Sequence, residues 1–544
     1  MTTQQAGAKA EGASGGLAIS PPRDAFSATY SAGDAQVVWT RLVADLETPV
    51  SAYLKLSSAG ALGGNASGQS AMSFLLESVE GGATRGRYSV IGLQPDLVWR
   101  AFGEKAEINR APLADAAAFE PETAPTLDAL RALLSESHIA IPEDLPPMVA
   151  GVFGHMGYDM VRLVERLPDG PPDDLGVPDS LLMRPTLMAI FDTVKDEITI
   201  VTPVRPGSAS ADEAFEAATA RLRAASDALS APLQSMAIAG DAGDTTAFEA
   251  AFNEPTSNTT PARYLDMVET AKDYIAAGDA FQIVLSQRFS TPFELPPFAL
   301  YRALRRTNPS PFLFHLDFGE YALVGSSPEI LVRVRDGEVT IRPIAGTARR
   351  GTTRDEDQTL AEGLLADPKE CAEHLMLLDL GRNDVGRVAE IGSVEVTDQF
   401  VIERYSHVMH IVSNVIGRLR SDTDAIAALM AGFPAGTVSG APKVRAMEII
   451  DELETAKRGP YAGCVGYFSA DGNMDTCIVL RTGLVKDGTL HVQAGAGIVY
   501  DSVPESEQQE CINKAKALVR AAEEAVRFAG GSVPSRSGNL GPWS

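Results

Sequence analysis

The stretch IRPIAGT, at residues 341–347, decides how this chain is interpreted, together with the segments that flank it. GSSPE precedes it at residues 325–329, and DPKECAEH follows it at residues 367–374. Around it, residues 320–345 and 461–500 form long strand-like runs with apolar alternation, whereas Asp367-Pro368 is a typical helix start. These patterns predict a mixed α/β fold with strands and helices in both halves of the chain.

The composition is that of a soluble globular protein. The chain has 544 residues, of which 45% are hydrophobic and 22% are charged, and its formal net charge is −26. A chain this acidic repels polyanions, so we expect no binding to nucleic acid or to an anionic membrane surface. There is no apolar run of about 18 residues and no secretory signal pattern, and the four cysteines form no CxxC pair. We therefore expect a cytoplasmic protein with reduced thiols.

Composition and periodicity divide the chain into five segments. We predict a disordered leader over residues 1–24, a strand-rich region over 25–204 and a connector over 205–262. A second folded region covers 263–526, and a flexible tail covers 527–544. Within the second region, the pattern from Tyr264 to Ala277 predicts an amphipathic helix that ends at Gly278, followed by a strand.

Two helices are predicted to carry acidic faces. Glu370 and Glu373 follow Asp367 on the first helix, and Glu507 and Glu510 follow Pro504 on the second. Because residues three apart share a helix face, each pair points in one direction. Two such faces would suit Mg²⁺, which prefers a few carboxylates, water and substrate oxygens. The plainer alternatives are a capping box at Glu370, a solvated Glu373 and a surface ion pair between Glu510 and Lys514.

Several glycine-rich turns could present backbone N–H groups to an anion, among them Gly346-Thr347 and Gly495-Ala-Gly497. None of them has the spacing of an ATP phosphate loop or of a dinucleotide fingerprint, so we expect neither cofactor. Arg481 ends the strand-like pattern of residues 477–482. It is either a surface cation or, if it faces a pocket, a bidentate partner for a carboxylate.

In this order, the segments resemble the chorismate-utilising enzymes, and among them the anthranilate synthase component I family. The resemblance covers residues 48–522. It implies large, mostly antiparallel sheets packed face to face and flanked by helices. It also implies an Mg-dependent lyase that converts chorismate and ammonia to anthranilate and pyruvate, the first committed step of tryptophan biosynthesis. Residues 263–526 would be the chorismate-binding catalytic region.

The resemblance assigns a role to each site residue. Glu373 and Glu510 would bind Mg²⁺, with Glu370 and Glu507 beside them. Glu329 would be the general acid, and His410 would serve the second half of the reaction, although a packed core histidine is the plainer alternative. Thr347 joins them in the catalytic set. The substrate-binding residues would be Gly346, Thr437, Tyr461, Arg481, Gly495, Gly497 and Lys514.

Two positions separate this chain from relatives with other reactions. Aminodeoxychorismate synthases typically carry a lysine where this chain has Ala345. Isochorismate and salicylate synthases place a lysine that activates water where this chain has Gln282. Ammonia is already a nucleophile and needs neither lysine. The alternatives that stay open are an aminodeoxychorismate synthase component I and a non-catalytic tryptophan-sensing subunit.

The resemblance also implies two partners besides chorismate and ammonia. The region over residues 25–204 contains an element similar to the feedback site of the family, so tryptophan is the expected inhibitor. Its binding residues would be Glu77, Ser78, Pro311, Phe312, Leu313, Val465 and Tyr467. The chain has no Gly-x-Cys-x-Gly turn that would carry a glutaminase nucleophile, so a separate glutamine amidotransferase subunit, component II of the enzyme, is expected to supply the ammonia.

Overall fold

The computed structural model describes residues 17–59, 72–80, 84–233, 255–405 and 408–529. The first part of the chain contains α1 (Arg23–Ser31), β1 (Gln36–Val43), α2 (Pro49–Ser58), β2 (Ser73–Glu80), β3 (Thr84–Phe102), β4 (Lys105–Asn109), β5 (Glu120–Pro121), α3 (Thr126–Glu136), β6 (Gly151–Met156), β7 (Ser180–Asp192), β8 (Glu197–Val204) and α4 (Ala211–Ser230).

The second part begins with β9 (Thr256–Ser257), α6 (Pro261–Ala277), β10 (Gln282–Pro292), α7 (Pro297–Thr307), β11 (Phe312–Asp317), β12 (Tyr321–Ser327), β13 (Ile330–Arg335), β14 (Glu338–Ile341), β15 (Ile344–Arg349), α8 (Arg354–Ala366) and α9 (Pro368–Gly386). It continues with β16 (Glu395–Arg404), β17 (Val408–Arg418), α10 (Ala425–Gly432), α11 (Gly436–Ser439), β18 (Gly440–Ala441), α12 (Lys443–Leu453), β19 (Cys464–Ser469), β20 (Met474–Ile478), β21 (Thr482–Lys486), β22 (Thr489–Ile498) and α13 (Pro504–Ala529).

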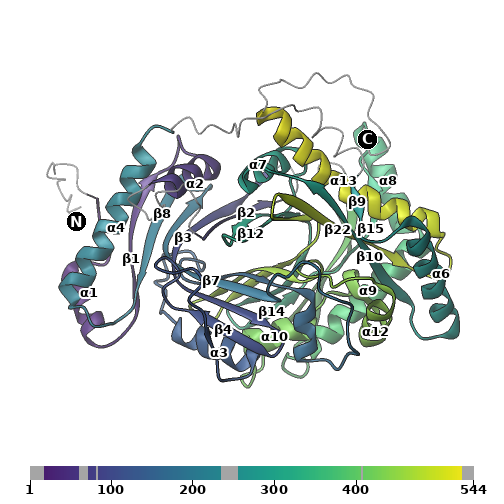
Figure 1. The fold of residues 1–544 in the computed structure, drawn as a ribbon, viewed down its shortest axis with the longest axis horizontal. Coiled ribbons are helices and arrows are strands. Elements are labelled where there is room, and N and C mark those ends of the chain that lie inside the picture. Colours follow the sequence, from purple (N-terminus) through teal and green to yellow (C-terminus); the bar gives the residue numbers. More distant parts are fainter. Residues whose placement is uncertain (1–16, 60–71, 81–83, 234–254, 406–407, 530–544) are drawn as a thin grey trace, which may run out of the picture.

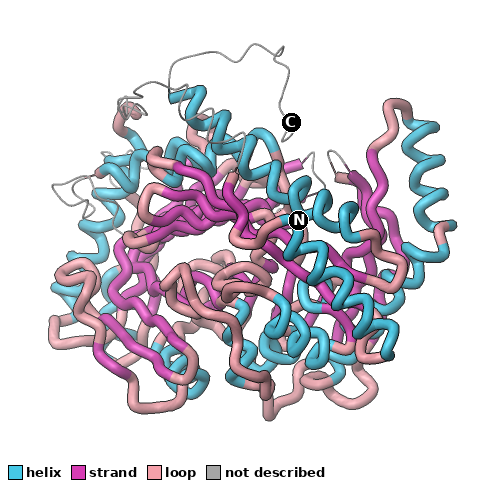
Figure 2. Tube along the Cα trace, turned by 45° about the vertical axis from the view of Figure 1, so that its right-hand side comes forward, coloured by secondary structure: helices cyan, strands magenta, loops and turns pink. Residues whose placement is uncertain are grey.

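The strands lie inside the molecule and the helices outside (Figures 1 and 2). One hydrophobic core, which includes Phe314 and Val465, is built mostly from strand residues and lies between sheet faces. A second core joins strands to α4, α6, α7 and α13, and a third joins strands to α3, α9, α10 and α12. The named strand pairings are all antiparallel. The predicted fold, with antiparallel sheets packed face to face and flanked by helices, is confirmed.

The two predicted folded regions share one strand network. β11 pairs with β2, with Leu313 opposite Glu77, and β19 pairs with β6, with Val465 opposite His155. Strands from the first half of the chain therefore continue the sheet of the second half. The predicted boundaries at residues 204 and 263 mark a change in composition along the sequence. One hydrophobic core contains residues from both sides of them.

Local sequence signals explain where the helices near the site begin and end. The side chain of Asp367 accepts hydrogen bonds from the backbone N–H groups of Lys369 and Glu370 at the start of α9. Gly278 ends α6 with a left-handed φ of 90°, which glycine adopts without strain. Both helix boundaries agree with the sequence expectation.

The ends of the chain fall partly outside the described residues, which exclude 1–16 and 530–544. Where the predicted leader is described, Ser20 bridges to Trp39 and α1 begins at Arg23, so this part of the leader is folded. α13 likewise continues to Ala529, three residues into the predicted tail. Within the described residues, no helix is both long and apolar enough to cross a membrane.

Candidate active site

A pocket of about 570 Å³ lies where β10 and β22 approach α9 and α13. The structure brings all the predicted catalytic, substrate-binding and metal-binding residues into its lining. They are Glu329, Gly346, Thr347, Glu370, Glu373, His410, Thr437, Tyr461, Arg481, Gly495, Gly497, Glu507, Glu510 and Lys514. Ala345 and Gln282, the two discriminating positions, line it as well.

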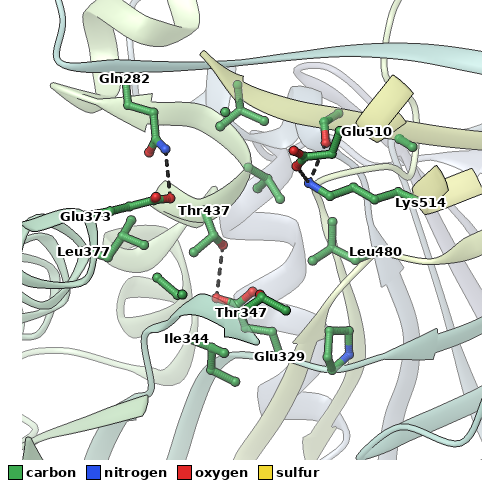
Figure 3. A pocket seen from close by; sticks show the side chains of 18 of the residues that line it. Gln282, Glu329, Ile344, Thr347, Glu373, Leu377, Thr437, Leu480, Glu510 and Lys514 are labelled. Carbon is green, nitrogen blue, oxygen red and sulfur yellow. Dashed lines mark hydrogen bonds and ion pairs between the residues drawn. The ribbon is translucent and has the colours of Figure 1, made fainter. Parts of the chain in front are cut away.

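Glu329 is the buried acid of this pocket. It lies between β12 and β13, directly before Ile330, and its Oε1 accepts a hydrogen bond of 3.0 Å from the hydroxyl of Thr437 (Figure 3). Burial raises the pKa of Glu329 to about 8, although Thr437 and the nearby Arg481 each lower it. A carboxyl group with this pKa holds its proton at neutral pH and can donate it to a leaving group.

Arg481 lies in the connection between β20 and β21 and not at the end of a strand, as its sequence pattern indicated. β20 ends at Ile478, and Arg481 has a positive φ of 47°, a conformation that L residues seldom adopt. The strained backbone turns the residue toward the pocket, where burial lowers the pKa of its guanidinium. The structure therefore favours the pocket-facing reading of Arg481 over the surface one.

Besides Arg481, hydrogen-bond donors for an anionic ligand group lie around Gly495. Lys514 donates to the carbonyl oxygen of Gly495 at 2.9 Å and pairs with Glu510 at 2.7 Å. A Cβ atom at Gly495 would come within 2.8 Å of the Tyr461 hydroxyl, and one at Gly497 within 2.7 Å of Nε2 of Gln282. At Gly495 the backbone oxygen of Leu285 is also only 2.9 Å from that position, so a larger residue would not fit, whereas at Gly497 the side chain of Gln282 would have to move. Glycine at both positions leaves the backbone open to a ligand.

Four carboxylates from α9 and α13 face the same space. Glu373 and Glu510 enter the pocket from opposite sides in Figure 3. Nε2 of Gln282 donates to Oε1 of Glu373 at 3.1 Å, which fixes that carboxylate. Burial and the neighbouring Glu373 raise the pKa of Glu370; burial and Glu510 raise that of Glu507. Bringing a cation between the two helices would relieve this repulsion.

Oxygen donors suit a hard cation such as Mg²⁺, but these carboxylates are not gathered around one point. Within residues 17–529 as described, no three His, Cys, Asp or Glu side chains converge closely enough to hold a metal by themselves. Mg²⁺ usually takes only one or two carboxylates and completes its shell with water and substrate oxygens. The donor set therefore fits a metal that binds together with its substrate.

His410 on β17 lies beside the glycine turn of β15. Its Nδ1 lies 3.1 Å from the carbonyl oxygen of Gly346, which accepts its hydrogen, and 3.0 Å from the hydroxyl of Thr347. This tautomer leaves Nε2 free to accept a proton. Burial lowers the pKa of His410, so the ring is neutral at physiological pH. Although His410 is packed, as the plainer alternative held, it is also part of the pocket.

Known proteins are similar to this chain in sequence and in architecture. The family model for chorismate binding enzymes matches residues 74–520. The chain belongs to this family. It is 56% identical to anthranilate synthase component 1 of Cereibacter sphaeroides, over 93% of this chain and 98% of that protein. For the protein of that name from Thermus thermophilus, identity is 48% over 89% of this chain and 97% of the relative.

Solved structures of related enzymes have the same fold as this chain. The crystal structure of anthranilate synthase component I from Streptococcus pneumoniae TIGR4 matches with a TM-score of 0.68 at 40% identity, over 80% of this chain and 92% of that one. The menaquinone-specific isochorismate synthase from Escherichia coli has the same fold, with a TM-score of 0.63 at 21% identity, covering 90% and 95% of the two chains.

This chorismate binding enzyme has a second cavity, of about 380 Å³, between β2, β11, β19 and β20. All but one of the residues predicted to bind tryptophan line it, namely Glu77, Ser78, Phe312, Leu313, Val465 and Tyr467. Pro311, the residue before β11, is not among the lining residues. Tyr301 and Arg305 of α7 both donate to the buried carboxylate of Glu77, which holds it in place.

Sequence reasoning missed residues in both cavities of this family member. Gln493 lines the large pocket, and Arg333, Arg335 and Asp475 line the smaller one. Gln493 could have been found, because it precedes Gly495 by two residues on β22 and so shares its face. No sequence signal pointed to Arg333 or Arg335, since a strand pattern alone does not show which face of the strand lines a cavity.

Proposed function

We propose that the chain is the large subunit of anthranilate synthase and converts chorismate and ammonia to anthranilate, pyruvate and water. One observation carries this proposal: a buried acid, a cluster of cations and two acidic helix faces meet in one pocket of a chain that spans nearly the full length of the anthranilate synthase relatives. The pocket volume of about 570 Å³ is ample for a ligand of chorismate's size.

Chorismate carries two carboxylates, and the pocket offers a separate place for each. Arg481, Tyr461 and the backbone at Gly495 and Gly497 bind the carboxylate of the enolpyruvyl group. Lys514 and Thr437 complete the anion site. A guanidinium binds a carboxylate through two parallel hydrogen bonds, which fixes the orientation of the ring.

Mg²⁺ would be held by Glu373 and Glu510, with Glu370 and Glu507 next to them. When bound, it would hold the ring carboxylate of chorismate and withdraw charge from the ring. Gln282 positions the carboxylate of Glu373 for this role through their hydrogen bond of 3.1 Å. The raised pKa values of Glu370 and Glu507 fit neighbouring carboxylates whose repulsion a bound cation would relieve.

The first half of the reaction needs a proton at the leaving group. Ammonia adds to C2 of the ring while the C4 hydroxyl departs, and Glu329 donates the proton that turns this hydroxyl into water. The pKa of about 8 keeps Glu329 protonated for this step. A donor with an ordinary carboxyl pKa would already be ionised at neutral pH.

The second half removes the enolpyruvyl group. The proton at C2 is taken up, the bond from C3 to the ether oxygen breaks, and the ring becomes aromatic as pyruvate departs. The neutral His410, with Nε2 free, serves this elimination. Thr347, 3.0 Å from Nδ1, orients the imidazole ring.

The retained ether is the product feature that distinguishes an aminodeoxychorismate synthase. Ala345 lines the pocket where that reaction would place a lysine, so this chain lacks the nucleophile. A non-catalytic tryptophan sensor would have no use for the acid and cations of the large pocket. We therefore place chorismate turnover in this pocket and tryptophan inhibition in the second cavity.

A separate glutamine amidotransferase subunit supplies the ammonia, and the complex works in the cytoplasm. The four cysteines of this chain are free; three of them are buried, and the fourth, Cys371, lies within the helix α9 with its thiol directed at the carbonyl oxygen of Leu365. Burial raises the pKa of the Cys464 and Cys511 thiols to about 12, which makes both unreactive. Free thiols also fit a reducing compartment.

The test is an assay of the isolated chain with chorismate, Mg²⁺ and ammonium, which follows anthranilate fluorescence and pyruvate together. Equal amounts of the two products are expected. Consumption of chorismate without pyruvate would replace this proposal with an enzyme that stops at an aminated or hydroxylated ring. Tryptophan binding without any turnover would support the sensor alternative.

A further inference from the structure

A third cavity lies at the other end of the molecule from the pocket proposed to bind chorismate. It has a volume of about 1020 Å³ and is lined by residues of α1, β1 and β7 and of the segments that follow α3 and β8. In Figure 1, α1 and β1 lie at one end of the long axis, away from α9 and α13. No lining residue of this cavity also lines the chorismate pocket or the cavity beside β2. A ligand here would therefore occupy a site of its own.

One cation in this cavity, Arg205, has no carboxylate partner among the described residues. Arg205 directly follows β8, and its Nη2 donates to the carbonyl oxygen of Ser137 at 3.2 Å. Its Nε is buried and donates to no atom within the described part of the chain. A buried N–H group without an acceptor costs free energy, so an acceptor brought by a ligand would bind favourably at this atom.

The neighbouring carboxylates bind a different arginine, Arg184 of β7. Asp96 accepts hydrogen bonds from Nε and Nη2 of Arg184 at 2.8 and 3.0 Å, and Glu136 accepts one from its Nη1 at 3.1 Å. Nη1 of Arg184 also donates to the hydroxyl of Ser137 at 3.3 Å, which places both guanidinium groups next to Ser137. Burial and the charge of Arg184 lower the pKa of Arg205 to about 10, so Arg205 is a cation at neutral pH. The cavity therefore has a fixed positive charge without a hydrogen-bonded counter-charge.

We propose that this cavity binds a small organic molecule through an oxyanion, a carboxylate or a phosphate, that pairs with Arg205. A guanidinium group can bind either oxyanion through two parallel hydrogen bonds. The net charge of −26 gives the chain as a whole no attraction for anions, so binding depends on this local cation. The third carboxylate of the lining, Asp34, is exposed, so water screens its repulsion of an anion.

Apolar side chains in the same lining favour an organic ligand over a bare ion. They include Val37 and Ile139, which are buried, and Trp39, which is partly buried. Ligand pockets typically combine an apolar lining with a few polar groups that fix orientation, and their volumes are about 300–1,000 Å³. The ligand would place its apolar part against these side chains and its oxyanion at Arg205.

Trp39 provides a signal that is specific to this cavity. Of the three tryptophans in the sequence, Trp39 lines the cavity, Trp99 is fully buried in a core and Trp543 lies outside the described residues. Fluorescence is measured in the full chain and in Trp39→Phe, and the difference is assigned to the cavity. Two probes are titrated separately at constant ionic strength. Inorganic phosphate has only the oxyanion, whereas hexanoate has a carboxylate and an apolar chain.

We expect a saturable change in the Trp39 signal with at least one probe, and a dissociation constant higher by about tenfold or more in Arg205→Met. Arg223→Met removes the same charge from an exposed position of α4 outside the cavity lining, and its affinity should stay within about twofold of the wild type. Tighter binding of hexanoate would identify a carboxylate with an apolar part as the ligand, and tighter binding of phosphate would identify a phosphate. Without a probe, the melting temperature of Arg205→Met should equal or exceed that of the wild type, because a buried cation without a carboxylate partner is removed.

Two outcomes would overturn the proposal. The absence of a saturable Trp39 signal with both probes would leave the cavity without a ligand of this class. Equal affinity in the wild type and in Arg205→Met would show that Arg205 does not bind the oxyanion. If Arg205→Met does not fold, Arg205→Lys replaces it. Lysine keeps the charge but cannot form two parallel hydrogen bonds, so the affinity should fall by about threefold or more, and an unchanged affinity would again overturn the proposal. Chorismate turnover is not measured in this experiment, so its result is independent of the proposed function.

Discussion

The hydroxyl of Thr437 donates a hydrogen bond of 3.0 Å to Glu329, a carboxyl group that burial keeps protonated at neutral pH. The two residues are 108 positions apart in the sequence. Their contact joins the connection between β12 and β13 to the short helix α11 in the lining of the pocket. A proton donor that is both buried and oriented is what the departure of a ring hydroxyl requires.

The pKa of Glu329 sets the alkaline limit of activity. The protonated form is the active one, so activity should be present below about pH 8 and fall as the pH rises through this value. Glu329→Gln should lower kcat by roughly 10²–10⁴-fold, the usual contribution of a general acid. The measurement is the pH profile of kcat with ammonia held constant as the free base. A Glu329→Gln variant with wild-type kcat would assign the proton to another group.

The hydrogen bond from Thr437 should shift the alkaline limit of activity. Its hydrogen bond lowers the pKa of Glu329 by stabilising the ionised form, so Thr437→Val should raise this pKa and move the alkaline limb to higher pH. A net hydrogen bond of about 0.5–1.5 kcal/mol corresponds to a shift of roughly half to one pH unit. Thr437→Ser keeps the hydroxyl and serves as the control, with an unshifted limb. A limb that moves to lower pH would contradict the assignment.

The acidic faces of α9 and α13 should determine the need for Mg²⁺. We expect Glu373→Gln and Glu510→Gln each to reduce turnover nearly to zero and to raise the Mg²⁺ concentration needed for half-maximal activity by at least about tenfold. Glu505→Gln is the control, because Glu505 lies on α13 outside the pocket lining. The measurement is a titration of activity with Mg²⁺ after treatment with a chelator. Unchanged turnover in either variant would remove that glutamate from the metal site.

Local signals in the sequence carried most of these expectations. Asp367-Pro368 marks the start of α9, and Gly278 marks the end of α6, because caps act within a few residues of themselves. The spacing of Glu370 and Glu373 then places both on one helix face. The motifs implied the members of the pocket only through the resemblance, since no spacing in the chain brings α9 next to α13.

Long-range geometry was beyond the sequence. The left-handed backbone at Arg481 is imposed by tertiary packing, so its strand-like neighbours gave the wrong local structure. The pairing of β2 with β11 joins segments separated by more than 200 residues, and no local pattern fixes that register. Pro311 was also predicted to bind tryptophan, and it is not among the residues that line the cavity.

Tryptophan should bind in the cavity beside β2 and inhibit the enzyme from there, outside the chorismate pocket. Ser78 lines it opposite Phe312, and Ser78→Leu would place a larger apolar side chain in the space. We expect the tryptophan concentration for half inhibition to rise at least tenfold, equivalent to about 1.4 kcal/mol of binding free energy, while kcat without tryptophan stays within twofold.

Strand β20 connects this cavity to the chorismate pocket, which explains how tryptophan can act on catalysis. Cys477 of β20 lines the cavity, and the next residue, Ile478, hydrogen-bonds through its N–H to the carbonyl oxygen of Glu329. Ser226→Leu, on α4 and outside the cavity lining, is the control. Binding is measured by calorimetry alongside the inhibition assay. Wild-type inhibition in Ser78→Leu would place the tryptophan site elsewhere.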